Sequence, residues 1–509
     1  MHKKEIKAII KKQLKREYPN WKRLTKKEKK EIARKVLAEV VKGYDFSKEI
    51  EMPKHELLGI EQQTLNGDIM NIEEMERLID NHKESKLIRF DRKRRHSQVK
   101  DVELQFIDDL LDNEIIDMLL SYEGYTPSMR DFMPSTFFRA ELLKCIKYPE
   151  ISYRKFCGDD KRYDGYKENN DYTGMAQKQN RVFIGLPLIR RQMISHVQLS
   201  QFRAGLTFSQ LVNLMVYVLH HFKQHGYLGD GDIHCVDSTE LAVDCQQLLA
   251  TFKIGKQQIR VYDDIDCDCG VRRKKRDKSV YVVGYRMHTL TAINAKTGHS
   301  FPLISLLAPA NHHDSHFLSP LIKLGKAIGL ELRFITADEA YHDKDGSILS
   351  ETGVHLIKPP NSKVLLPENV DNETMQVRFD DLCEIPMCYL GAEDGFHEFK
   401  CGALPGECPR SETCHQFRNI SIDNGCFQRI LYGSDEVFKA LDIRKNGERP
   451  FNLLKNREGL EQVRVRSQHG LLARCTFATI VTLLLEMSGT RRKREKKQKP
   501  IQMEFPLAA

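Results

Sequence analysis

The chain of 509 residues is 40% apolar and carries a formal net charge of +9. Its length allows about three or four domains of roughly 150 residues each, with at least one sizeable core. No run of about 18 apolar residues occurs, which excludes a membrane-spanning helix, and the first ten residues lack the long apolar stretch of a secretory signal. We therefore expect a cytoplasmic protein without a membrane partner, and 13 cysteines that are mostly reduced. The mild basic excess suits a polyanionic partner.

Residues 1–225 are predicted to be mostly helical and basic. Within a basic N-terminal region, 1–130, residues 1–44 favour two amphipathic helices, with Thr25 as the N-cap of the second. Their lysine-rich face is explained either as a solvated surface or as a DNA-contacting arm. Residues 131–225 are predicted to be a helical DNA-binding region. Its end, 188–222, is compatible with a helix-turn-helix and equally with a plain helical bundle.

Residues 226–360 follow a different order of elements. A strand at 233–237 comes first, and two long β-rich runs follow on either side of a hairpin turn at Asn294–Gly298. A helix, a strand ending in Asp338, a short helix near 345–352 and a further strand complete the series. The order β, β, β, α, β, α, β predicts a mixed sheet with helices on its faces.

Three segments complete the chain. Residues 361–432 contain six of the 13 cysteines and are predicted to be a Cys-rich insertion with its own small β-type fold. Residues 433–490 return to helices, and 491–509 begin with a basic tail that has no predicted structure.

Two of the predicted strands end in a carboxylate, Asp237 and Asp338. Ligands gather at the carboxyl ends of strands in sheets of this kind, and a third carboxylate on a neighbouring helix would complete a site. Taken alone, Asp237 is equally explained as a helix cap or a surface residue. Several carboxylates at one point repel each other unless cations lie between them, and hard oxygen ligands suit Mg²⁺ or Mn²⁺, here a pair of ions.

The third carboxylate is predicted to be Glu448. Pro450 suits the first turn of a helix, so we start this helix near Glu448. Lys455 lies seven residues further, about 700° around the helix, and therefore shares the face of Glu448 to within roughly 20°. Glu458 and Glu461 are the rival candidates for the third carboxylate.

Four stretches of this region resemble the DDE transposases of bacterial insertion sequences. They read VDST at Asp237, VVGYRMH at 282–288, APANHHDS at 308–315 and ADEAY, which ends at Tyr341. The family's helix signature is Tyr, two residues, Arg, three residues, Glu, six residues and Lys. The same spacing occurs here with a Leu in place of the Tyr, at Leu441, Arg444, Glu448 and Lys455.

The resemblance covers about 230–360 and 433–485 and implies an α/β fold class with an RNase H-like mixed sheet and flanking helices. It implies that Asp237, Asp338 and Glu448 bind the Mg²⁺ or Mn²⁺ pair and that Arg444 and Lys455 contact transposon-end DNA. The implied reaction cuts the terminal inverted repeats and joins the 3′-hydroxyl to target DNA, in a dimer or larger assembly. A nuclease that does not join strands and a non-catalytic DNA-binding derivative remain open.

The insertion also offers a candidate structural zinc site. Three of its cysteines, Cys401, Cys408 and Cys414, follow one another at intervals of seven and six residues, a looser spacing than a Cys-x-x-Cys pair. Buried or free thiols are an equally good interpretation. The candidate ligands are Cys388, Cys401, Cys408 and Cys414. Two further features have open interpretations: the basic stretch 271–278 is a phosphate-contacting or a solvated loop, and His288 lines the cleft or is a satisfied sheet histidine.

Overall fold

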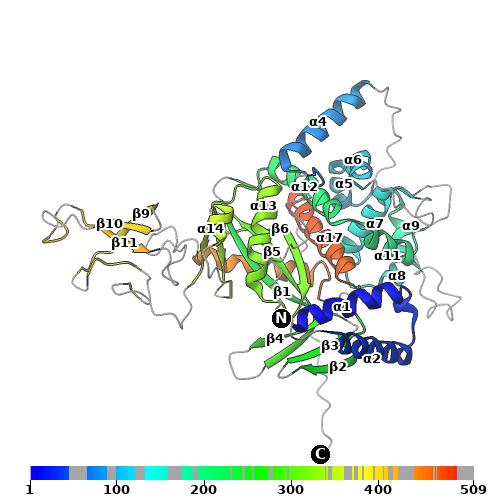
Figure 1. Ribbon diagram of the computed structural model, residues 1–509. Helices are drawn as coiled ribbons and strands as arrows, with labels where there is room; N and C mark the ends of the chain where they lie inside the picture. The colour runs from blue at the N-terminus through cyan, green and yellow to red at the C-terminus, as the bar shows by residue number, and fades with distance from the viewer. Residues whose placement is uncertain are drawn as a thin grey trace, which may run out of the picture.

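A computed structural model gives the mixed α/β architecture of the chain (Figure 1). The structure describes residues 2–44, 66–88, 99–120, 132–158, 175–186, 193–229, 232–243, 247–254, 257–273, 279–294, 297–338, 340–341, 347–359, 370–371, 376–380, 383–393, 396–404, 406–410, 417–421, 441–461, 465 and 467–489. The basic tail at 491–499 and the candidate ligand Cys414 lie outside these residues.

The central sheet has six strands. Its order is β4-β5-β1-β7-β8, and β6 also pairs with β5. β1, β5 and β6 are antiparallel neighbours, whereas β7 and β8 run parallel to β1, so the predicted mixed sheet is confirmed. The strands are β1 (Ile233–Ala242), β4 (Asp268–Arg273), β5 (Ser279–Ile293), β6 (Ser300–Pro309), β7 (Phe334–Ala337) and β8 (His355–Ile357).

Short helices connect the second half of the sheet as the sequence predicts. The η5 turn (Asp314–Phe317) leads into α13 (Leu318–Ala327), and α14 (Ser347–Thr352) joins the parallel strands β7 and β8. α13 packs on the sheet face that carries Leu290, because Gly325 lies against that side chain. The opposite face is covered by α16 (Arg449–Asn456) and by the C-terminal helix α17 (Gln468–Met487).

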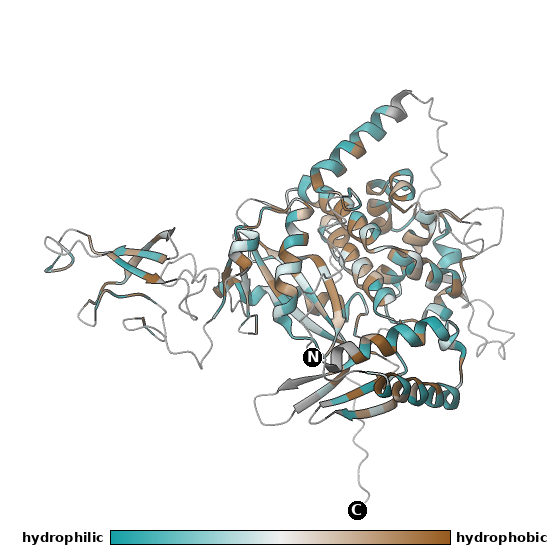
Figure 2. Cartoon of the chain, viewed as in Figure 1, coloured by the Kyte–Doolittle hydropathy of each residue, from teal (hydrophilic) through white to brown (hydrophobic). Residues whose placement is uncertain are grey.

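The helical body packs around α12 and α17 (Figure 2), whose apolar residues form the centre of the main core. α17 is long and apolar enough to cross a membrane, but 89% of that stretch is buried inside the protein. The other helices of this body are α4 (Ile72–Ile88), α5 (Val102–Leu110), α6 (Asn113–Leu120), α7 (Pro134–Lys147), α8 (Tyr153–Cys157), α9 (Met175–Gln179), α10 (Arg181–Ile184), α11 (His196–Gly205) and α12 (Phe208–Gln224).

α11 and α12 meet at 96° through a short turn, which has the shape of a helix-turn-helix. However, α12 is buried continuously from Gln210 to His220. A recognition helix must present side chains to the major groove. The bundle interpretation of this segment therefore fits the structure better.

The two predicted N-terminal helices are confirmed as α1 (His2–Glu17) and α2 (Lys26–Lys42), linked by the 3₁₀ turn η1 (Trp21–Arg23). Thr25 caps α2 in a capping box with Glu28. Both helices pack on a hairpin that the sequence analysis did not predict, β2 (Leu248–Ile254) and β3 (Gln257–Tyr262). We call these four elements the N-terminal module; they share a separate apolar core that includes Ile10, Val36 and Ile259.

The Cys-rich segment is a β-type insertion, as predicted. β9 (Met387–Glu393), β10 (Phe396–Cys401) and β11 (Phe417–Ser421) form an antiparallel sheet with a small core of its own around Phe399. In Figure 1 this sheet stands apart from the central sheet.

Two strand predictions were wrong in detail. The first strand does not end at Asp237 but continues to Ala242, because residues 238–242 remain paired with β5. The start of the predicted basic loop at 271–278 belongs to β4, and 274–278 lie outside the described residues.

Candidate functional site

Asp237 and Asp338 are neighbours on adjacent parallel strands. Val236 of β1 is in register with Ala337 of β7, and each aspartate directly follows its member of this pair. Adjacent strands lie about 4.8 Å apart. Pairing with β7 stops here although β1 continues, so both carboxylates lie at the same edge of the parallel pair.

Glu448 is brought to these aspartates by the close approach of Gly447 to β1. The 3₁₀ turn η6 (Lys445–Glu448) precedes α16, which begins one residue after Glu448. A Cβ on Gly447 would lie 2.8 Å from Cys235 Sγ, so only glycine fits. Cys235 and Asp237 are two residues apart on β1 and share a sheet face. Glu448, which follows Gly447 and precedes the first residue of α16, therefore lies on the same sheet face as Asp237.

The electrostatics of Asp237 reflect this convergence. Burial, together with the negative charges of Asp338 and Glu448, raises the pKa of Asp237 to about 7, although the Ser238 N–H and Arg444 act to lower it. The pKa of Asp338 is also raised, mainly by burial and in part by Asp314. Arg444 opposes the charge of both aspartates, and Arg286 also lowers the pKa of Asp338.

Each aspartate is held by a backbone N–H. The Ser238 N–H donates to Asp237 Oδ1 at 2.7 Å, and the Ala340 N–H donates to Asp338 Oδ1 at 2.9 Å. These bonds fix one oxygen of each carboxylate and leave the other for a ligand.

A second polar cluster lies on the opposite face of β1, directly beneath the site. Ser238 Oγ donates to Asp314 Oδ1 at 3.1 Å, and Arg286 Nη1 donates to the same carboxylate. Arg286 Nη2 donates to Glu240 Oε1 at 3.0 Å, so one guanidinium joins β1, β5 and η5. Arg286 and Asp314 belong to the stretches VVGYRMH and APANHHDS, but the sequence alone predicted no role for Asp314. The Asp of APANHHDS was the only signal for it.

His288 belongs to this lower cluster and does not line an open cleft. It is fully buried, stacks on Phe317 with ring centroids 4.0 Å apart, and lies 3.6 Å from Asp314. Burial, with Arg286 and His312, lowers the pKa of His288 well below its ordinary value, so the ring is neutral. Within the described part of the chain, neither ring nitrogen has a hydrogen-bond partner, so the satisfied-histidine interpretation does not hold either.

The rival carboxylates are placed elsewhere. Glu458 is 3% exposed and interacts with Arg474 of α17 inside the helical body. Glu461 forms an ion pair with Lys455 at 3.8 Å, which places Lys455 at the other end of α16 from Glu448. Neither rival contributes to the pKa of Asp237, whereas Glu448 does.

The donor set has the chemistry that a hard divalent cation requires. The charges of Asp338 and Glu448 raise the pKa of Asp237, which indicates a local excess of negative charge. A bound divalent cation would neutralise this charge. Among the described residues, no three His, Cys, Asp or Glu side chains are already grouped as metal ligands. The structure therefore presents neighbouring carboxylates and not a closed ligand set.

Cys388, Cys401 and Cys408 of the insertion are free thiols. Cys388 is exposed, Cys401 and Cys408 are half-buried, and the Arg410 N–H lies 3.4 Å from Cys408 Sγ. His397 is buried against Tyr389, at 3.3 Å from its hydroxyl. A zinc site here stays a prediction because Cys414 lies outside the described residues.

Comparison with known proteins adds no family. No protein-family model matches the chain, and no curated protein matches it. The functional argument therefore depends on the residues themselves.

Proposed function

We propose that the chain is a DNA transposase that cleaves the ends of an insertion sequence and joins the freed 3′-hydroxyl to target DNA. One observation carries the proposal: Asp237 and Asp338 follow paired residues of two parallel strands, and the Gly447 contact brings Glu448 to the same face. The antiparallel strands β1, β5 and β6, followed by β7 and β8 across helical connections, support the RNase H-like form of the α/β fold.

Asp237, Asp338 and Glu448 would hold the Mg²⁺ or Mn²⁺ pair. When bound, such ions activate a water or 3′-hydroxyl and stabilise the leaving oxygen of a phosphodiester. The chain supplies the ligands and controls their protonation. Asp237, with its pKa of about 7, must release its proton to act as a ligand, so the reaction should require neutral or higher pH.

Arg444 and Lys455 would bind the DNA backbone on either side of the carboxylates. Arg444 already acts on Asp237 electrostatically, so a phosphate that enters the site meets a guanidinium there. Among the described residues, the Lys455 side chain has one ion pair, at 3.8 Å from Glu461, and it can exchange this partner for a phosphate. Recognition of the terminal inverted repeats is assigned to the helical regions before residue 226, and a dimer or larger assembly would hold two ends.

The test uses the purified full chain and duplex DNA that carries the inverted repeats flanking its gene. With Mg²⁺, we expect a nick at the 3′ end of the element and joining of that end to a supercoiled plasmid. Asp237→Asn, Asp338→Asn and Glu448→Gln should each reduce both products at least a hundredfold. Glu461→Gln, a rival carboxylate of the same helical region, should retain them.

The outcomes separate the remaining functions. Cleavage without plasmid joining would indicate a nuclease, and binding without cleavage would indicate a non-catalytic derivative. Undiminished cleavage by Asp237→Asn or Asp338→Asn would remove the mechanism itself.

A further inference from the structure

Two sets of basic residues in the N-terminal module differ in their partners. Lys7, Lys11 and Lys15 of α1 pair with Asp266 or Asp268, and Lys29 of α2 pairs with Asp263 at 2.8 Å. These pairs hold the helices against the segment from the end of β3 to the first residue of β4. Lys30, Arg34 and Lys42 form no ion pair with any described residue and are exposed on α2.

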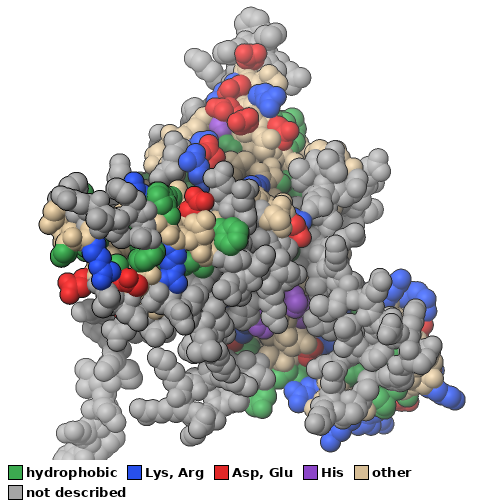
Figure 3. Space-filling model, turned by 60° about the vertical axis from the view of Figure 1, so that its left-hand side comes forward, with side chains coloured by type: hydrophobic (Ala, Val, Ile, Leu, Met, Phe, Trp, Pro, Cys, Tyr) green, Lys and Arg blue, Asp and Glu red, His purple; other side chains and the backbone are tan. Residues whose placement is uncertain are grey.

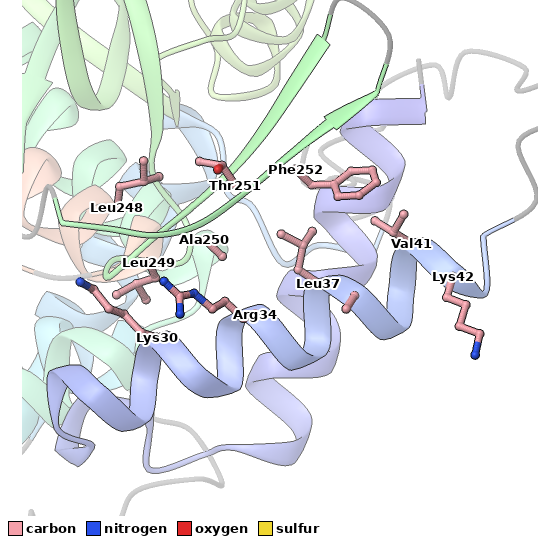
Figure 4. A pocket seen from close by; sticks show the side chains of 11 residues that line it. Lys30, Arg34, Leu37, Val41, Lys42, Leu248, Leu249, Ala250, Thr251 and Phe252 are labelled. Atoms are coloured by element: carbon pink, nitrogen blue, oxygen red, sulfur yellow. The ribbon is translucent and has the colours of Figure 1, made fainter.

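The second set lines a groove between α2 and β2 (Figure 4), with a volume of about 620 Å³. Every charged residue of its lining is a cation: Lys30, Arg34 and Lys42. Lys30 and Arg34 lie at one end of the groove, beside Leu249, and Lys42 marks the other end. Lys and Arg side chains also gather over this lower right part of the molecule in Figure 3. A ligand of the groove must therefore be negatively charged.

The apolar lining shows that the ligand is more than a row of charges. Leu37 and Val41 point from α2 toward the strand, and the ring of Phe252 projects from β2 above them (Figure 4). Phe252 is 36% exposed and Leu248 is 42% exposed, although both belong to a two-stranded sheet that packs on α2. An aromatic face beside cations is the combination that binds nucleotides of a single strand.

The spacing of the cations favours a polymer over a single anion. Lys30 and Arg34 are four residues apart, about 6 Å along the helix, and Arg34 and Lys42 are about 12 Å apart. A repeated charge along an extended strand meets such a row at several points, whereas one phosphate meets only one. A groove of about 620 Å³ can hold part of one strand but cannot enclose a duplex.

We propose that the groove between α2 and β2 binds single-stranded DNA, with phosphates on Lys30, Arg34 and Lys42 and a base stacked on Phe252. This inference rests on the proposed transposase function, because a nick at the element's end creates strand termini that can unpair from the duplex. The groove lies on a different part of the chain from Asp237, so it adds a binding site distinct from the carboxylates.

The test measures binding of a fluorescent 15-nucleotide oligo(dT) to the full chain in EDTA. Lys30→Glu/Arg34→Glu/Lys42→Glu should weaken binding more than tenfold and reduce the slope of log K against log salt by about 2, the value for three single-strand phosphate contacts. The matched control Lys12→Glu/Lys27→Glu/Lys35→Glu makes the same charge change at exposed lysines outside the groove. It should bind at least fivefold more tightly than the groove variant.

Phe252 separates stacking from charge. Phe252→Leu should weaken oligo(dT) binding about fivefold or more, because it keeps apolar area but loses the ring face, whereas Phe252→Trp should preserve binding. Both variants retain a folded hairpin, which circular dichroism and thermal unfolding will verify.

Three results would overturn the inference. Equal weakening by the two triple variants would show that binding depends on the net charge of the protein and not on the groove. Tighter binding of a duplex with the same number of phosphates through the groove residues would exclude a single-strand site. Equal competition by poly-glutamate would indicate an acidic polypeptide as the ligand. Because EDTA removes divalent ions, binding is measured in the absence of cleavage, and the outcome is independent of the proposed catalytic activity.

Discussion

Arg286 donates from Nη1 to both carboxylate oxygens of Asp314, at 2.8 and 2.9 Å. The same guanidinium reaches Glu240, so one cation balances two carboxylates in a largely buried place. Asp314 also accepts from Ser238, the residue whose N–H holds Asp237. Ser238 therefore links the Arg286–Asp314 cluster on one face of the sheet to Asp237, the proposed catalytic carboxylate, on the other face.

Removal of Arg286 should therefore destabilise the protein. Arg286→Met leaves Asp314 and Glu240 without their cation, and we expect a loss of about 3 kcal/mol in the free energy of unfolding. Lys83→Met breaks the exposed pair with Asp80 and should cost less than about 1 kcal/mol. Urea denaturation of both variants measures the difference. Similar values for both would show that the Arg286 contacts contribute no more than a surface pair.

Ionisation of Asp237 should oppose folding when no divalent ion is present. Its folded pKa of about 7 exceeds the unfolded value of about 3.9, so its contribution to stability is full below pH 4 and is lost as the pH rises to about 7. Asp237→Asn has no carboxyl group to ionise at this position, so it does not lose this stability as the pH rises. The variant should therefore match the wild type near pH 4 and exceed it at pH 8, by up to about 4 kcal/mol.

Thermal unfolding across this pH range in EDTA measures the effect. Asp442→Asn, an exposed carboxylate near the site, is the control and should follow the wild type. Mg²⁺ should raise the melting temperature of the wild type at pH 8 and leave Asp237→Asn nearly unchanged. A variant that loses stability at pH 8 in EDTA would contradict the raised pKa.

Gly447→Ala tests how Glu448 is positioned. The new Cβ would lie 2.8 Å from Cys235 Sγ, and this overpacking should cost about 1–3 kcal/mol and displace Glu448. Cys235→Ala removes the sulfur and leaves the nearest Cys235 atom, its Cβ, at 3.4 Å. The double variant should recover most of the stability and the cleavage rate of the Cys235→Ala single variant. Additive losses in the double-mutant cycle would show that the two residues are not coupled.

Asp266 should stabilise the docking of α1 in a pH-dependent way. Burial alone would raise the pKa of Asp266, but Lys11 and Lys15 lower it below its ordinary value. Its stabilisation is then present above the unfolded pKa of about 3.9 and is lost as the pH falls through the lower folded value. Asp266→Asn should lower the melting temperature at pH 7 and have little effect near pH 2. Asp80→Asn, at an exposed pair, should have little effect at either pH.

The sequence was informative where the signals were local. Thr25 and Glu28 form a capping box within four residues, and the turn at Asn294–Gly298 separates two strongly apolar runs. The alternation of strand and helix after Asp314 predicted α13, β7, α14 and β8 in order. Each of these elements is specified by residues close together in the chain.

The elements that the sequence did not predict depend on contacts between residues that are distant in the chain. The alternation of apolar and polar residues from Ala250 to Ile254 is a strand signal, but it is short, and the helices that cover this strand lie more than 200 residues earlier. β1 continues past Asp237 because Glu240 meets Arg286 across the strands. Asp237 and Asp338 were predicted to meet because strand ends in such sheets converge. The role of Gly447 emerged only from its approach to Cys235.

The dependence of α1 and α2 on β2 and β3 has a consequence for synthesis on the ribosome. Domains generally fold as units while the chain emerges. Here α1 carries an apolar stripe, Ile6, Ile10 and Leu14, whose covering hairpin is translated more than two hundred residues later. The nascent chain carries this apolar surface without its hairpin for more than two hundred residues of elongation, so a holdase chaperone should bind it and release it only when residue 262 has left the exit tunnel.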